Sequence, residues 1–168
     1  RVVGDHMGML ATIMNALALS SFLNRNQVVN KVFSALGIAG VAKDYDKNDA
    51  LEVLSSGSVG IFAGGTGNPF FTTDTAACLR AIELQCDLVV KATNVEGVYS
   101  ADPNTDKSAK KYDEITFNEV IENDLSVMDM TAVLLCRDHK MPIIVCNIGS
   151  EDNLLKAANG DPVGTRVS

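Results

Sequence analysis

The spacing of apolar residues predicts that helices and strands alternate along the chain. From Met7 to Leu23, apolar side chains recur at helical spacing, and further apolar positions widen the stripe beyond one face. This helix is either a central core helix or one shared between a core and a subunit interface. β-branched and aromatic residues then predict a strand within 27–36, and a short helix is expected over 48–55.

A second pattern begins with a compact apolar run at 59–63, which is followed by a glycine-rich loop. A helix is expected over 75–84 and a buried strand over 87–93. This succession of strand, loop, helix and strand predicts a βαβ unit. Because parallel sheets bind ligands outside the carboxyl ends of their strands, the loop at 64–73 is the first candidate site.

The second half of the chain continues the alternation. A turn signal at 101–104 (ADPN) and a lysine-rich stretch at 106–111 predict an exposed hairpin or flap. Further helices are expected over 116–122, 129–139 and 153–158, and strands over 142–147 and 162–167. No repeat or interdomain linker interrupts the pattern, so we predict a single α/β domain over 1–168.

Composition and net charge limit the classes of function that this protein can have. The 168 residues are 46% apolar and 21% charged, which is typical of a soluble globular domain. The net charge is −7 and the basic residues are scattered, so binding to nucleic acid is not expected. Acidity does not exclude a small anionic ligand, because backbone N–H groups at a helix start can hold phosphate. Polar residues interrupt the longest apolar stretch, within 7–23, so no membrane span is expected.

The chain has four cysteines, Cys78, Cys86, Cys136 and Cys146, and none of them forms a CxxC pair. Each has apolar neighbours within an expected helix or strand. We therefore interpret them as reduced core thiols, which fits a cytoplasmic protein.

The glycine-rich loop has the chemistry of a binding site. Gly64 and Gly65 allow a ligand to approach the main chain closely. Neutral hydrogen-bonding groups and two aromatic rings follow: Thr66, Asn68, Thr72, Thr73, Phe70 and Phe71. These groups suit an uncharged, hydrogen-bonding heterocycle. The alternative is a helix start, with Thr72 or Thr73 as the cap and Phe70 as a hydrophobic staple, and both can hold at once.

Four motifs, in order along the whole chain, resemble the bacterial uridylate kinases of the amino-acid-kinase superfamily. They are GDHMGMLAT at 4–12, GGTGNPFFTTDTAACLRAIE at 64–83, KATNVEGVYSADP at 91–103 and MDMTAVLLCRDHKMPIIVCN at 128–147. The resemblance implies a three-layer α/β/α sandwich with a mainly parallel central sheet. It also implies transfer of the γ-phosphoryl group of Mg²⁺-bound ATP to UMP, a homohexamer, activation by GTP and inhibition by UTP.

Two alternatives remain open. Another member of the superfamily, acting on a carboxylate or carbamate, would share the ATP-side motif but should lack the complete TGNPFFTTD loop. A non-catalytic nucleotide-binding or storage protein on the same scaffold belongs to a different class.

The resemblance assigns UMP binding to one set of residues: Asp5, Thr66, Gly67, Asn68, Pro69, Phe70, Phe71, Thr72 and Thr73. Asp5 would accept hydrogen bonds from the ribose hydroxyls, as a carboxylate can. From the residues alone, Asp5 could instead cap the helix expected at Met7.

The resemblance assigns ATP binding to Thr93, Asn94, Tyr99 and Asp102, although the residues alone predict a simple turn at Asp102. Phosphoryl transfer also needs carboxylates that hold Mg²⁺ or orient cations. Asp74 and Asp129 are the candidates, with helix capping as the alternative for each. No resident metal-ligand set is predicted.

The family's first strand, with its phosphate-handling lysine and glycine-containing loop, and a second glycine-rich loop are expected before Arg1. We therefore expect the N-terminal portion of the domain to be absent from this chain. Without that cationic half of the phosphate site, the chain is predicted to be inactive alone.

Overall fold

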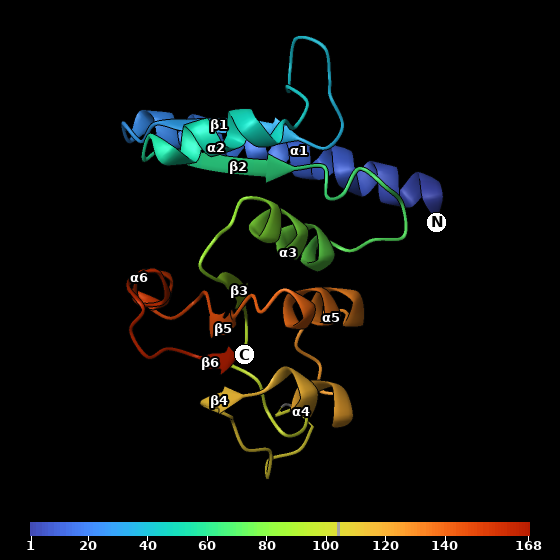
Figure 1. Ribbon diagram of the computed structural model, residues 1–168, viewed down its shortest axis with the longest axis vertical. Helices are drawn as coiled ribbons and strands as arrows, with labels where there is room; N and C mark the ends of the chain where they lie inside the picture. The colour runs from blue at the N-terminus through green and yellow to red at the C-terminus, as the bar shows by residue number, and fades with distance from the viewer. Residues whose placement is uncertain (104) are drawn as a thin grey trace. The chain divides into compact units, whose positions relative to one another are not determined.

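The computed structural model describes residues 1–103 and 105–168 (Figure 1). Contacts within the chain group into two compact units, residues 1–76 and 77–168. That the two form one domain over 1–168 stays a prediction.

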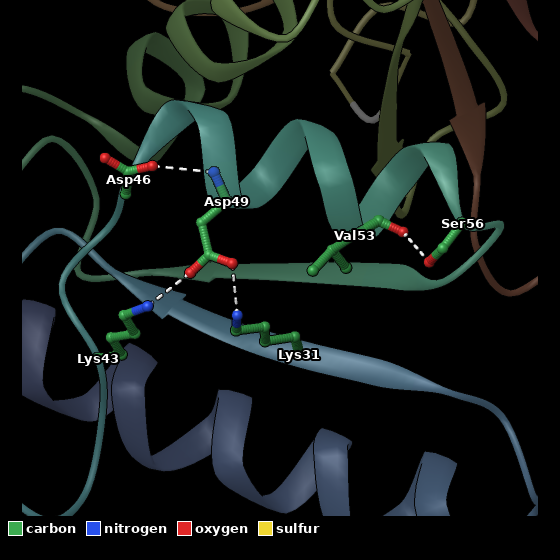
Figure 2. A network of polar contacts seen from close by, with 6 residues as sticks. All are labelled: Lys31, Lys43, Asp46, Asp49, Val53 and Ser56. Carbon is green, nitrogen blue, oxygen red and sulfur yellow. Dashed lines mark hydrogen bonds and ion pairs between the residues drawn. The ribbon is translucent and has the colours of Figure 1, made fainter.

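The first unit is a pair of parallel strands between two helices. Its elements are α1 (Val2–Arg25), β1 (Asn30–Ser34), α2 (Lys47–Ser55) and β2 (Val59–Ala63). The register runs from Asn30 opposite Val59 to Ser34 opposite Ala63. Both helices pack against both strands, and Figure 2 shows α1 and α2 on opposite sides of the pair.

Side chains alternate between the two faces of β2, as a period of two requires. Ile61 and Ala63 pack in one cluster with Ile13 and Ala16 of α1. Phe62 points the other way and stacks on Phe33 of β1, with 5.4 Å between ring centroids. The end of β2 is therefore held from both sides, which fixes where the glycine-rich loop begins.

Helix α1 is longer than predicted, because it begins at Val2 rather than near Met7. The helix has 24 residues and contains an 18-residue window with a mean hydropathy of 1.3, so by length and composition alone it could cross a membrane. One such helix near the N-terminus is weak evidence for a span, because core helices of soluble proteins and signal sequences meet the same criteria.

The boundary between the units falls within helix α3 (Thr73–Glu83). The second unit contains a four-stranded sheet. Its strands lie in the order β3 (Val89–Thr93), β5 (Ile143–Asn147), β6 (Thr165–Val167) and β4 (Glu114–Ile115). Only the β5–β6 pair is antiparallel among these. The remaining helices are α4 (Phe117–Glu122), α5 (Met130–Asp138) and α6 (Asn153–Asn159).

Strand β5 is buried on both faces, as its apolar run predicts. Ile143 and Val145 belong to the large core cluster that includes Cys136 of α5. Ile144 belongs to a second cluster with Ala157 of α6. The strand is therefore the centre of the second unit.

The pairing of the strands and the burial of one cysteine differ from the predictions, and one short strand was not predicted. The predicted βαβ unit over 59–93 is wrong in its pairing: β2 pairs with β1 and β3 pairs with β5, in different sheets. The parallel crossover is instead β1–α2–β2. Strand β4 was not predicted, because two residues give no periodic signal. Cys86 is exposed after the end of α3 and is not a core thiol, whereas the other three cysteines are buried; all four are free.

Candidate functional site

The glycine-rich loop after β2 has a backbone that only glycine adopts readily. Gly64, Gly65 and Gly67 have φ values of +78°, +59° and +77°. A Cβ on Gly67 would lie 2.9 Å from the carbonyl oxygen of Ala35, so the chain there has no room for a side chain. The N–H of Gly64 donates to Oγ1 of Thr12 in α1 at 2.9 Å. The loop therefore starts in a fixed position against α1.

Asp5 of α1 contacts this loop directly. Its Oδ2 accepts a hydrogen bond from the backbone N–H of Phe70 at 2.8 Å, and Phe70 is itself left-handed at φ +76°. The Phe70 N–H, and secondarily Arg1, lower the pKa of Asp5, so its carboxylate stays ionised near neutral pH. Asp5 lies inside α1 and does not cap it, so the capping alternative for this residue is wrong. The predicted link between Asp5 and residues 66–73 is a contact in the structure.

Some polar side chains of the loop form hydrogen bonds within the loop or at the start of α3. Asn68 N–H donates to Thr66 Oγ1, and Asn68 Nδ2 donates to the Thr66 carbonyl oxygen, both at 3.2 Å. Thr72 Oγ1 accepts from the N–H of Thr75 at 3.2 Å and so caps α3, as one alternative predicted. Thr73 is the first residue of that helix, and Pro69 lies between Asn68 and Phe70.

Phe70 and Phe71 keep 62% and 54% of their surface exposed, so their rings can contact a ligand. The guanidinium of Arg1 lies over the Phe70 ring, with its Cζ 5.4 Å from the centroid. Phe70 is thus an exposed surface beside Arg1 and does not serve as the hydrophobic staple of α3.

A cavity of about 430 Å³ in the second unit brings together two of the predicted ATP-binding residues, Tyr99 and Asp102. They lie in the predicted hairpin, which is confirmed by the antiparallel bridge between Tyr99 and Lys111. The backbone carbonyl of Asp102 also accepts the N–H of Asp106 at 2.8 Å. Asn104, which belongs to the turn signal at 101–104, lies outside the described residues.

Thr93 and Asn94 are not among the residues that line this cavity. Thr93 ends β3, as expected for the carboxyl edge of a parallel strand, and Asn94 follows it.

The opposite wall of the cavity was not predicted. It is formed by residues 123–126, which follow α4 and include Asp124 at φ +48°. The polar sequence NDLS was the available signal, but it also fits an ordinary loop. A larger cavity of about 710 Å³ in the same unit lies beside Lys111 and Arg166 and contains none of the predicted residues. We therefore take the smaller cavity as the candidate.

The two candidate carboxylates belong to different units. Asp74 lies in the first turn of α3, within residues 1–76, whereas Asp129 lies within 77–168 and caps α5 by accepting the N–H of Ala132 at 3.2 Å. Capping therefore holds for Asp129. Among residues 1–103 and 105–168, no group of three or more His, Cys, Asp or Glu side chains could hold a metal ion.

Comparison with known proteins decides the family. The sequence model described as "Amino acid kinase family" matches residues 2–147. The chain belongs to the amino acid kinase family. The predicted resemblance is thereby confirmed at the level of the superfamily.

Two curated relatives of this amino acid kinase are uridylate kinases. That of Pseudomonas syringae pv. syringae (strain B728a) is 54% identical over 99% of this chain and 68% of the relative. That of Vibrio cholerae serotype O1 (strain ATCC 39541 / Classical Ogawa 395 / O395) is 53% identical over 100% of this chain and 69% of the relative.

Solved structures support the same fold. The UMP kinase from Bacillus anthracis matches with a TM-score of 0.97 at 36% identity, covering 100% of this chain and 70% of that one. The UMP kinase from Ureaplasma parvum matches with a TM-score of 0.95 at 36% identity, covering 100% and 72%. The predicted fold class, an α/β amino-acid-kinase fold with mainly parallel strands, is confirmed.

Proposed function

We propose that this amino acid kinase is a UMP kinase, which transfers the γ-phosphoryl group of ATP to UMP and gives UDP. The observation that carries the proposal is the 54% identity to a uridylate kinase across 99% of this chain. The complete TGNPFFTTD loop at 66–74 agrees with it. Neither alternative, a superfamily member acting on a carboxylate or carbamate or a non-catalytic binding protein, is favoured.

On the UMP side, we assign the loop from Thr66 to Thr73 together with Asp5. The ionised carboxylate of Asp5 is a suitable acceptor for ribose hydroxyl groups, because each of its oxygens can accept more than one hydrogen bond. Phe70 and Phe71 offer exposed rings against which a flat base can lie. The backbone at Gly65 lets the nucleotide approach the main chain, because the space where a Cβ would lie is open and glycine adds no side chain there.

On the ATP side, we assign Thr93, Asn94, Tyr99 and Asp102. The cavity beside Tyr99 and Asp102 supports this assignment, because its volume of about 430 Å³ lies within the size range of small-molecule sites. The aromatic ring of Tyr99 suits a nucleotide base, and the exposed carboxylate of Asp102 suits hydroxyl donors. Thr93 and Asn94 lie at the end of β3, where ligands of parallel sheets bind.

Mg²⁺ enters this proposal as part of the ATP complex, where it neutralises phosphate charge. Mg²⁺ in such sites takes one or two carboxylates and completes its shell with phosphates and waters, so single carboxylates such as Asp74 or Asp129 fit. The remaining work of the protein is to position both nucleotides and to stabilise developing charge, since phosphoryl transfer needs little covalent chemistry from the enzyme. Asp74 and Asp129 would orient cations and are not required as bases.

We extend the proposal to a cytoplasmic homohexamer that GTP activates and UTP inhibits. Free cysteines support a reducing compartment. Exposed apolar side chains on α1, including Leu10, Met14 and Leu17, support association with another copy. Sedimentation of the full-length protein, with and without each nucleotide, tests this extension.

The substrate assay is the deciding experiment. The full-length protein is mixed with Mg²⁺, ATP and one of UMP, CMP, AMP or GMP, and the diphosphate product is measured. UMP should give the highest kcat/KM, because a site built to hydrogen-bond one base edge discriminates steeply against others. A higher value for CMP or AMP contradicts the proposed substrate, and nucleotide binding without any transfer favours the non-catalytic alternative.

A pair of variants tests the two binding assignments separately. Asp5→Ala should raise the KM for UMP by about tenfold or more, because it removes a charged hydrogen-bond acceptor, and should leave the KM for ATP nearly unchanged. Tyr99→Ala should do the reverse. If Asp5→Ala leaves the KM for UMP unchanged, Asp5 does not belong to the site.

A further inference from the structure

Phe70 adopts a backbone conformation that its own chemistry disfavours. It is one of the few non-glycine residues at positive φ, with a value of +76°, and a Cβ is crowded there. Such a conformation persists only where the surroundings enforce it, and such residues are concentrated at functional sites. The contacts that hold Phe70 are therefore informative.

Two residues at the start of α1 contact Phe70. Its N–H donates to Asp5 Oδ2 at 2.8 Å, and its ring lies beside the Arg1 guanidinium, 5.4 Å from Cζ to centroid. Arg1 and Asp5 are four residues apart, so they share one face of the helix. Arg1 Nε also lies 3.5 Å from the same Oδ2 of Asp5. Each of the three residues contacts the other two, and we call them the Arg1–Asp5–Phe70 clamp.

The two carboxylate oxygens of Asp5 differ in their partners. Phe70 and Arg1 both use Oδ2, and Oδ1 has no protein partner among the described residues. One oxygen thus organises the loop while the other remains available to a ligand.

We propose that Arg1 is a positioning residue of the UMP site: its guanidinium, placed between the Asp5 carboxylate and the Phe70 ring, holds residues 66–73 in the conformation that accepts UMP. This inference rests on the proposed function. Arg1 acts through Phe70 and Asp5 and need not touch the nucleotide.

The expected effect is modest, because the ion pair is open to solvent. The Arg1 side chain is 64% exposed, and exposed ion pairs contribute little. The contact of the Arg1 guanidinium with the Phe70 ring adds to the small effect of the ion pair. Arg1→Gln should therefore raise the KM for UMP by roughly two- to fivefold, the range that an exposed cation–π contact covers. The KM for ATP, the kcat at saturating UMP and the melting temperature should not change.

The test uses the full-length protein and four further variants. Arg1→Lys keeps the charge and should restore most of the UMP affinity. Arg25→Gln makes the same change at the exposed far end of α1 and should leave the KM for UMP at the wild-type value. Phe70→Leu removes the ring that Arg1 covers, and the double variant Arg1→Gln, Phe70→Leu completes a mutant cycle.

If Arg1 acts in part through Phe70, the double variant should raise the KM for UMP by less than the product of the two single increases. The inference is overturned if Arg1→Gln leaves the KM for UMP unchanged, if Arg25→Gln raises it equally, or if the two effects multiply in the double variant. These failures leave the proposed function standing, because the wild-type enzyme still phosphorylates UMP. A wild-type protein that does not phosphorylate UMP overturns the function itself.

Discussion

At the scale of single residues, Asp49 joins three segments of the first unit (Figure 2). Its carboxylate accepts from Lys31 of β1 at 2.6 Å and from Lys43 of the preceding loop at 2.7 Å, while its backbone N–H donates to Asp46, the cap of α2. The hydrogen bond from Lys31, followed by that from Lys43, lowers the pKa of Asp49, and the Asp49 bond raises the pKa of Lys43. One carboxylate is thus the shared counter-charge of two lysine ammonium groups.

We predict that Asp49→Asn lowers the melting temperature at pH 7, because it leaves two ammonium groups without their shared counter-charge. A lowered folded-state pKa means that the carboxylate stabilises the fold above its unfolded pKa of about 3.9 and loses this effect as the pH falls through the folded value. The gap between wild type and variant should therefore be constant from pH 7 to about pH 4 and narrow only below it.

Thermal unfolding of both proteins between pH 7 and pH 3 measures this gap. Glu52→Gln, on an exposed position of the same helix, is the matched control and should show no gap at any pH. A gap for Asp49→Asn that is equally large at pH 3 would contradict the electrostatic explanation.

Residue-scale detail was the least predictable part of the site. The resemblance placed Asp5 with residues 66–73, but the Asp5–Phe70 hydrogen bond joins positions 65 apart in sequence, which no local pattern reveals. Glycines marked the loop at 64, 65 and 67, yet Phe70 is equally left-handed and carried no signal. Its conformation depends on partners in α1, so tertiary contacts override its local preference.

At the scale of elements, Gly65 and Gly67 differ in why a larger residue is disfavoured. The backbone conformation alone disfavours it at Gly65, whereas lack of space for a side chain adds to this at Gly67. Both have positive φ, but a Cβ on Gly65 meets nothing within 4 Å, whereas a Cβ on Gly67 lies 2.9 Å from the Ala35 carbonyl oxygen. Gly65→Ala should cost about 1–2 kcal/mol of left-handed strain. Gly67→Ala should cost about 1–3 kcal/mol more, because the loop and the segment after β1 must move apart.

Chemical denaturation of the two variants gives the difference in unfolding free energy. We expect Gly67→Ala also to raise the KM for UMP more than Gly65→Ala does, since only the former displaces the loop. Equal losses of stability would show that the loop moves freely away from Ala35.

Element existence was predictable, but sheet membership was not. The apolar run at 59–63 matches β2 residue for residue, and every expected helix and strand has a counterpart. The runs that became β2 and β3 look alike because burial on two faces gives both the same composition. Which strand pairs with which depends on contacts distant in sequence, and β2 found its partner upstream in β1.

At the scale of the whole molecule, the four cysteines report how the second unit packs. Cys78 and Cys136 are fully buried in the large core cluster, and Cys146 is fully buried in the cluster beneath α6. Cys86 alone among them is exposed. Burial, and to a lesser degree Asp87, raises the pKa of the Cys86 thiol.

We predict that an aromatic disulfide reagent titrates one thiol in the native protein and four in denaturant. The thiolate is the reacting form, so the raised pKa should make the native reaction slow at pH 7 and faster as the pH rises past about 8.5. Cys86→Ser should abolish the reaction of the native protein and leave three thiols in denaturant, with the melting temperature unchanged because the side chain is exposed. If a second thiol reacts at a comparable native rate, one of the two clusters opens on that timescale. In that case Cys136→Ser and Cys146→Ser would identify the cluster, because only the substitution in the opening cluster removes the extra reactive group.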